Sequence, residues 1–328
     1  MNSIMLEKQI KDYAILAETF TLTAFFRYLN WCYFSENIVS YLMKTSNLSI
    51  DDLQKRWDWF DSVFWKEKWT LISALSFSTI IEARWELLNK TIKNISDENT
   101  IIIELASGFN PRWLYFVNKL WCNEKYFIET DLSKTIHLKS KFYDYLKTTW
   151  MKTPSLEKQN VENKNDWYNI YNKIKLLKWE NQQIKKVIIV CEGLLIYLDK
   201  KHQKVFFEEL NIIQELLKNE DIQTSFLTID MPTHENFTNW LVLEWFDFTS
   251  HINVMKNVDP IILESLHNTQ RDFLWENWLK TIQKYYYDDD IINNLHTPSL
   301  DKYKDLEWLK YKIQNFLKQN ILYAWLID

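Results

Sequence analysis

A turn of small residues gives the first sign of chemistry in this 328-residue chain. Ala106, Ser107 and Gly108 form the turn. It follows Thr100–Ile103, a β-branched run typical of a buried strand, and precedes Pro111, which suits the first turn of a helix. A strand, a small-residue turn and a helix N-terminus together are typical of a nucleotide or cofactor site, because backbone N–H groups there can meet a polar ligand. With one glycine, the signal is weak by itself.

Two acidic residues lie where later strands should end. Asp131 comes roughly 20 residues after the turn, at the spacing where an acidic residue can bind a ribose. Asp131 could instead serve as a carboxylate at the start of a helix from Ser133. Glu192 follows an apolar run and is expected at the carboxyl end of a central strand, where an open α/β sheet binds its ligand. A buried carboxylate there needs a partner.

Around these residues, the sequence alternates between apolar strand patterns and helical patterns. Strand candidates are Ile101–Leu105, Tyr126–Glu129, Val187–Val190 and Phe226–Ile229, with a weaker one near Gln159–Val161. Helical patterns lie between them at Pro111–Leu120, Ser133–Leu146, Trp167–Leu177 and Asp199–Leu217. This βαβ series predicts a parallel, doubly wound α/β sheet. The polar stretch Lys152–Lys164 is expected to be a surface loop.

The two flanks have different patterns. Residues 1–95 show helical spacing without strand-like alternation, and one helix is expected over Leu71–Ile92. Elements expected after Asp230 are a helical passage at Phe237–Leu266, a helix at Thr269–Asn277, a strand ending at Tyr287, a helix at Asp301–Leu317 and a strand at Ile321–Ile327. The chain should therefore contain a helical N-terminal region, 1–95, and an α/β domain, 96–328.

Four segments taken together are similar to a known family. They are Ala83–Asn89 (ARWELLN), Thr100–Arg112 (TIIIELASGFNPR), Tyr126–Phe142 (YFIETDLSKTIHLKSKF) and Val187–Leu198 (VIIVCEGLLIYL). In this order and spacing they resemble the leucine carboxyl methyltransferase family, which uses S-adenosylmethionine and includes O-methyltransferases of polyketide-type metabolism. The resemblance implies a Rossmann-like class I methyltransferase sheet of seven strands with the last one antiparallel. It also implies an N-terminal helical lid (1–95) and a helical insertion after the fifth strand (about 237–266).

The resemblance also assigns roles to residues. Arg84 would pair with the carboxylate of the cofactor's methionine group, which suits a guanidinium fork. Asp131 would hold the ribose, and Glu192 would lie near the sulfonium and the methionine amine. Asn160-Val161 stands in place of the family's adenine-contacting Asp-Leu pair. The cofactor-binding residues implied in full are Arg84, Glu104, Ala106, Ser107, Gly108, Asp131, Leu132, Asn160, Val161, Glu192 and Gly193.

The implied reaction transfers a methyl group in line from a sulfonium to an oxygen. Because the leaving group is already activated, catalysis is mostly positioning and desolvation. A carboxylate acceptor needs no base, whereas a hydroxyl acceptor needs one nearby. Tyr197 and His234 are candidates for such a base, and a structural role is the alternative for each. The N-terminal helices and the insertion would cap the crevice, and no metal is expected.

Composition bears on the remaining classes of function. The net charge of −5, from 39 basic and 44 acidic residues, disfavours a nucleic-acid partner. Cys32, Cys122 and Cys191 lack metal-site or CxxC spacing, which fits reduced thiols in the cytoplasm. The N-terminus lacks a signal-peptide pattern, and no apolar run reaches membrane-spanning length. A small-molecule or peptide acceptor is expected. A nicotinamide-dependent dehydrogenase and a catalytically silent interaction protein are the alternatives.

The glycine and tryptophan counts are abnormal. The chain has 2 glycines and 17 tryptophans, whereas average usage of about 7% would give roughly 23 glycines. Trp121, Trp179 and Trp278 follow helical patterns, at positions where a helix commonly ends with a left-handed glycine. Trp113, in the NPR-type loop, is a further candidate. We therefore hypothesise that many of the tryptophans are glycines in the living protein, encoded by UGA codons. The alternative is a tryptophan-rich core.

Overall fold

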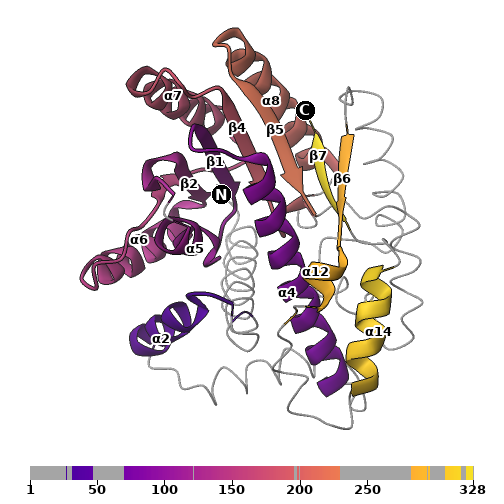
Figure 1. Cartoon of the computed structure of the whole chain (residues 1–328). Coiled ribbons are helices and arrows are strands. Elements are labelled where there is room, and N and C mark those ends of the chain that lie inside the picture. The colour runs from indigo at the N-terminus through magenta and orange to yellow at the C-terminus, as the bar shows by residue number, and fades with distance from the viewer. Residues whose placement is uncertain are drawn as a thin grey trace, which may run out of the picture.

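A seven-stranded sheet forms the centre of the molecule (Figure 1). The computed structural model describes residues 27, 32–46, 70–120, 122–195, 198, 200–229, 282–293, 295, 307–318 and 323–327. The strands are β1 (Thr100–Leu105), β2 (Phe127–Asp131), β3 (Ser155–Lys158), β4 (Lys186–Cys191), β5 (Gln223–Thr228), β6 (Ile282–Tyr286) and β7 (Tyr323–Ile327), in the order β3-β2-β1-β4-β5-β7-β6. Strands β1 to β5 are parallel, and β7 is antiparallel to β5 and β6. The predicted α/β class with a parallel sheet is confirmed.

The strand order changes direction at β1. This strand pairs with β2 on one side and with β4 on the other, and Leu105 lies opposite Cys191 at the carboxyl ends. In open α/β sheets, ligands bind outside the carboxyl ends of the strands at such a switch point. The turn after β1 and the residue after β4, Glu192, are therefore brought to the same edge of the sheet.

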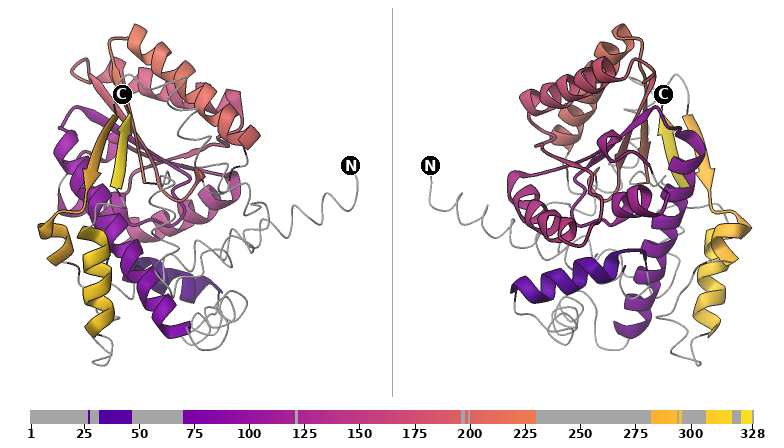
Figure 2. Two further views of the ribbon diagram at one scale, coloured as in Figure 1. Left: turned by 90° about the vertical axis from the view of Figure 1, so that its right-hand side faces the viewer. Right: turned by 60° about the vertical axis from the view of Figure 1, so that its left-hand side comes forward.

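Helices lie on both faces of the sheet (Figure 2). Alternating side chains of the strands pack against these two helical layers. The helices are α2 (Ser35–Ser46), α4 (Thr70–Ile95), α5 (Arg112–Lys119), α6 (Ser133–Lys147), α7 (Lys164–Glu180), α8 (Lys200–Asn219), α12 (Asp289–Asn293) and α14 (Glu307–Lys318), with a 3-10 turn η1 (Glu124–Tyr126). Ile102 and Ile188 pack with α4, α5, α12 and α14. Ile101 and Ile189 pack with α7 and α8 on the other face. Covering both faces excludes water from the strands, which explains their continuous apolar runs.

The third strand differs from the sequence prediction. β3 occupies Ser155–Lys158, so the predicted position at Gln159–Val161 is wrong. The stretch Lys152–Lys164 is also not a loop throughout, because it contains this strand. β3 lies at the edge of the sheet, and its side chains are half-buried or exposed. An edge strand of this kind needs no apolar run, so hydrophobic patterning does not find it.

Part of the N-terminal region shares the core of the sheet. Ala83, Leu87 and Leu88 of α4 belong to the same buried cluster as Ile102 of β1 and Val190 of β4. The predicted insertion at 237–266 and the helix at 269–277 lie outside the described residues. In the ranges that the structure describes, no helix is long and apolar enough to cross a bilayer.

Trp150 occupies a left-handed position just after α6. Its φ is +63°, and the residue is 96% exposed. The Trp150 N–H donates to the Lys147 carbonyl (3.1 Å), and the Met151 N–H donates to the Leu146 carbonyl (3.3 Å). These are the two bonds of a Schellman helix end, whose left-handed residue is usually glycine. An exposed indole gains no packing there, so this geometry supports glycine at position 150 in the living protein.

Other tryptophans support the glycine hypothesis less. Trp179 lies within the last turn of α7, so its predicted place beyond the helix end is wrong. Trp113 is fully buried and packs against phenylalanines of α5 and β2, as a core residue does. Its indole N–H is nevertheless buried without an acceptor among the described residues. Trp121 and Trp278 lie outside those residues. The support therefore comes from Trp150.

Trp150→Gly is expected to raise the free energy of unfolding by about 1 kcal/mol, because a Cβ is disfavoured in the left-handed conformation. Trp179→Gly is the matched control, since Trp179 is also exposed (74%) but lies in a helix. There, glycine should lower stability by about 0.5–1 kcal/mol. Urea denaturation measures both. A loss in both variants would contradict the helix-end interpretation, and a tryptophan mass at position 150 in the natural protein would contradict the glycine hypothesis.

Candidate functional site

The turn after β1 is hydrogen-bonded to the end of β2. The Ser107 N–H donates to the Thr130 carbonyl (2.9 Å), and the Gly108 N–H donates to Oδ2 of Asp131 (2.8 Å). Ala106 and Gly108 both have left-handed φ values, +48° and +49°. A left-handed alanine is strained and persists only where surrounding contacts hold it. The turn therefore has a defined position between the carboxyl ends of β1 and β2.

Four N–H groups between the turn and the first residue of α5 already have acceptors. The Arg112 N–H donates to Oδ1 of Asn110 (3.2 Å), and the Asn110 N–H donates to the Ser107 carbonyl (3.0 Å). The N–H groups of Ser107 and Gly108 are bonded to the end of β2, as described above. The expectation that bare N–H groups of this turn meet a ligand is therefore wrong for these four. A ligand would be recognised chiefly by side chains around the turn.

Asp131 contacts both the turn and the start of α6. Its Oδ2 accepts from Gly108, and its Oδ1 accepts from the Leu132 N–H (2.7 Å). Burial raises the pKa of Asp131, and the two backbone hydrogen bonds offset part of that rise. Both predicted roles thus fit this geometry, a carboxylate beside the turn and one at a helix start. Thr135 also hydrogen-bonds this carboxylate. Because a carboxylate has about four acceptor sites, one further hydrogen bond can still be accepted.

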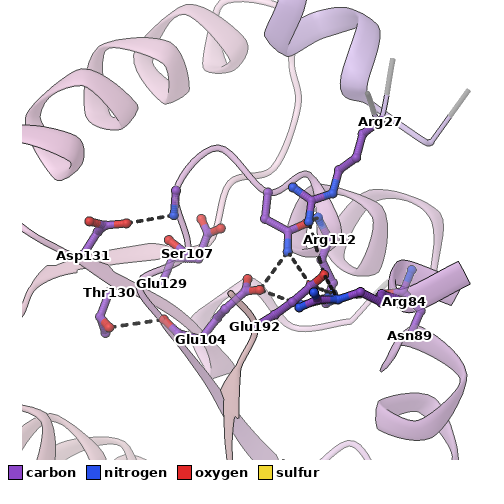
Figure 3. Close-up of polar contacts among 12 residues, drawn as sticks. Arg27, Arg84, Asn89, Glu104, Ser107, Arg112, Glu129, Thr130, Asp131 and Glu192 are labelled. Atoms are coloured by element: carbon purple, nitrogen blue, oxygen red, sulfur yellow. Dashed lines mark hydrogen bonds and ion pairs between the residues drawn. The ribbon is translucent and has the colours of Figure 1, made fainter. Parts of the chain in front are cut away.

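Arg112 is the centre of a buried ion-pair network (Figure 3). Its guanidinium donates to Oε1 of Glu104 (2.6 Å), Oε2 of Glu192 (2.5 Å) and Oδ1 of Asn89 (2.9 Å). Asn110 also donates to Oε1 of Glu104 (2.8 Å). The sequence reasoning gave Arg112 no role. The available signal was Glu104 itself, because a carboxylate inside an apolar strand requires a nearby cation.

Glu192 lies among three arginines, which point toward it in Figure 3. Besides Arg112, its Oε1 contacts Nη2 of Arg27 (3.5 Å) and Nε of Arg84 (3.7 Å). Burial alone would raise the pKa of Glu192, but the three guanidinium groups lower that pKa to about 2. Arg84, predicted to face a ligand carboxylate, thus lies beside Glu192. Arg27 was missed because no motif surrounds it in the sequence.

Several buried polar atoms of the network have no hydrogen-bond partner among the described residues. They are Nε of Arg27, Oε2 of Glu104 and Nδ2 of Asn89. Arg27, Arg84 and Arg112 each contact Glu192, and Arg112 also contacts Glu104. Burial raises the pKa of Glu104 to about 7, although the Arg112 cation offsets part of the rise. Buried polar atoms normally have partners, so a ligand that carries both an acceptor and a donor could pair with Nε of Arg27 and Oε2 of Glu104.

The segment after β3 lies near the end of β2. The Gln159 N–H donates to the Asp131 carbonyl (2.8 Å), which places Asn160 and Val161 immediately beyond that contact. The Val161 carbonyl accepts from the indole N–H of Trp167 (2.7 Å). The predicted adenine-contacting pair is therefore on the same edge of the sheet as Asp131, within a turn that leads into α7.

The loop after β4 contains the last predicted residues. Gly193 has a φ of +75°, which favours glycine. Tyr197 and His234, the candidate bases, lie outside the described residues. Within those residues, no group of three His, Cys, Asp or Glu side chains is arranged to hold a metal ion.

Comparison with known proteins gives little beyond this geometry. No family model and no curated protein matches the chain. The solved methyltransferase domain of bacterial CtHen1 is similar over 75% of this chain and 97% of that one, with 11% identity and a TM-score of 0.38. The plantazolicin methyltransferase BpumL, in complex with a monoazolic desmethylPZN analog and SAH, is similar over 99% of both chains, with 12% identity and a TM-score of 0.36. Likenesses of this size carry no argument about function.

Proposed function

We propose that this chain is an S-adenosylmethionine-dependent methyltransferase. The observation that carries the proposal is a pair of buried atoms in the ion-pair network, Nε of Arg27 and Oε2 of Glu104, which have no hydrogen-bond partner in the part of the chain that the structure describes. A free amino acid end has both a carboxylate and an ammonium, so it can fill a donor and an acceptor at once. S-adenosylmethionine has such an end, whereas a nicotinamide dinucleotide does not. This donor and acceptor pair therefore favours S-adenosylmethionine over a nicotinamide dinucleotide.

The residues around the site fit the rest of this cofactor. Arg27 and Arg84 would hold its carboxylate, and Glu104 its ammonium. Asp131 and the turn at Gly108 would hold its ribose. The bound cofactor supplies a methyl group on a sulfonium, which is already activated for transfer. The contribution of the protein is then to orient the reactants and to exclude water. The side chains of the network suit this role, because they are buried and joined by ion pairs and hydrogen bonds.

Within this class we propose an O-methyltransferase of the leucine carboxyl methyltransferase type, on the motifs of the sequence. The seven-stranded sheet with β7 antiparallel supports the class I methyltransferase fold. The acceptor would be a carboxylate or hydroxyl of a small molecule or peptide in the cytoplasm, rather than a nucleic acid. The lid (1–95) and the insertion (237–266) would cover the crevice. Further proposed contacts are Leu132, Asn160, Val161, Glu192 and Gly193, with Tyr197 and His234 as candidate bases.

Calorimetric titration with S-adenosylhomocysteine and with NADH tests this proposal. The wild-type protein should bind S-adenosylhomocysteine and not NADH. Asp131→Ala should weaken that binding about tenfold or more, because ribose hydrogen bonds are lost. Asp144→Ala, which alters an exposed carboxylate on α6, is the control and should bind as the wild type does. Binding of NADH would favour the dehydrogenase, and folded protein that binds neither ligand would favour the interaction protein.

The affinity for S-adenosylhomocysteine should fall as the pH falls through about 7. Burial raises the pKa of Glu104 to about 7, so this carboxyl is largely protonated below that pH. An ammonium needs an ionised acceptor, so protonation of Glu104 competes with binding. The affinity should therefore drop by up to about tenfold per pH unit in the wild type. Titrations from pH 5.5 to about 8 should show a flatter profile in Glu104→Gln. A wild-type affinity independent of pH would contradict this role.

A further inference from the structure

A second buried charge cluster lies beside the turn, and the network described above does not include it. The ammonium of Lys139, on α6, donates to Oε1 of Glu129 (2.6 Å) and to Oγ of Ser107 (3.0 Å). The hydroxyl of Tyr143 donates to Oε2 of Glu129. All four side chains are buried. Figure 3 shows Ser107 and Glu129 beside Asp131.

This cluster connects three different elements. Lys139 and Tyr143 are four residues apart on one face of α6, Glu129 is on β2, and Ser107 is in the turn after β1. A buried ion pair often contributes no more to stability than apolar side chains of the same size. The presence of Lys139 is therefore poorly explained by stability alone. What an apolar side chain cannot supply is the hydrogen bond to Ser107.

The turn that Lys139 reaches is strained. Ala106 is left-handed (φ +48°), and such a residue persists only where its surroundings hold it. Ser107 follows immediately and is held by its N–H bond to Thr130 and by its Oγ contact with Lys139. Gly108 then meets Asp131. A movement of Ser107 would therefore displace the contact between Gly108 and Asp131, where the ribose is proposed to bind.

We propose that Lys139 is a positioning residue. By bonding both Ser107 and Glu129, it holds Ser107 in place and so keeps Gly108 and Asp131 at the spacing that the cofactor requires. The effect on a cofactor rests on the proposed methyltransferase function. The effect on the turn itself does not, because it follows from the contacts of the protein alone.

Three variants separate positioning from stability. Lys139→Met removes the contacts of Lys139 with both Ser107 and Glu129. Ser107→Ala removes only the hydrogen bond between Lys139 and Ser107, and the ion pair of Lys139 with Glu129 remains. Tyr143→Phe is the matched control, because in the described part of the chain its hydroxyl bonds Glu129 and not the turn. Hydrogen exchange of the Ser107 and Gly108 amides, the affinity for S-adenosylhomocysteine and urea denaturation are measured for each variant.

Lys139→Met and Ser107→Ala should each speed exchange of these two amides and weaken S-adenosylhomocysteine binding, both by about tenfold or more. The double variant should show little further loss of affinity, because both changes remove the same hydrogen bond between Lys139 and Ser107. Tyr143→Phe should lower stability and leave exchange in the turn and affinity unchanged.

Ser107→Ala provides the result if Lys139→Met fails to fold. Wild-type exchange and affinity in Ser107→Ala would overturn the proposal, as would equal effects in Ser107→Ala and Tyr143→Phe. The wild type could bind no S-adenosylhomocysteine while the variants still speed hydrogen exchange in the turn as expected. That result would support the positioning role of Lys139 and refute the methyltransferase function.

Discussion

Arg112→Met is expected to lower the free energy of unfolding by about 3–5 kcal/mol, because it leaves buried carboxylates without their cation. Arg112 contacts Glu104 at 2.6 Å and Glu192 at 2.5 Å, and these side chains are only 2% and 6% exposed. Glu192 keeps two more distant arginines in the variant, so most of the loss should come from Glu104. Urea denaturation followed by circular dichroism measures the effect.

Lys90→Met is the matched control for this prediction. Lys90 also contacts two carboxylates, those of Asp288 and Asp290, both at 2.7 Å, but their side chains are 52% and 69% exposed. Exposed ion pairs contribute about 0–1 kcal/mol, so this variant should lose less than about 1 kcal/mol. Adding Glu104→Gln to Arg112→Met should recover part of the loss. Equal losses of unfolding free energy in Arg112→Met and Lys90→Met would contradict the claim that the ion pairs of Arg112 are shielded from water.

Arg27→Met is expected to weaken S-adenosylhomocysteine binding by about 10- to 100-fold, because a hydrogen bond to a charged group is worth about 1.5–3 kcal/mol. Arg27 is buried, and its Nε has no partner among the described residues. Glu192 retains Arg112 at 2.5 Å in the variant, so its charge stays compensated. The fold should therefore survive, and calorimetric titration at constant pH can measure the change in affinity.

Two comparisons make the Arg27→Met result specific. Lys44→Met removes an exposed cation from α2, in the same N-terminal region, and should leave the affinity unchanged. Methylthioadenosine, which lacks the amino acid end, should bind Arg27→Met and wild type equally. An equal loss for both ligands would show that Arg27 supports the fold of the site rather than the amino acid end.

The parallel strands could be predicted from the sequence because helices cover both faces of the sheet. Strands β1 and β4 therefore contain long apolar runs, which stand out from the neighbouring sequence. β3 could not be placed in the same way, because an edge strand with half-exposed side chains keeps its polar residues. The helix end at Trp150 was also not predictable, because tryptophan is not a residue from which a left-handed helix end is inferred.

The candidate site was predictable as far as strand ends determine it. Asp131 ends β2, and Gly108 and Glu192 come shortly after the neighbouring parallel strands β1 and β4, so topology alone brings the three residues to one edge. The arginines were harder to place, because a long side chain can reach a partner far away in the sequence. Arg27 is 165 residues from Glu192. Only the side-chain geometry shows that the Glu192 carboxylate is already paired with arginines and that Oε2 of Glu104 has no partner among the described residues.

The proposed function requires that an amino acid end binds between Arg27 and Glu104. Titrating the wild-type protein with S-adenosylhomocysteine and with methylthioadenosine under one set of conditions measures what that end contributes to binding. Two charge-assisted contacts distinguish these ligands, so S-adenosylhomocysteine should bind about 100-fold more tightly or better. Equal affinities, or folded protein that binds neither ligand, would contradict the claim.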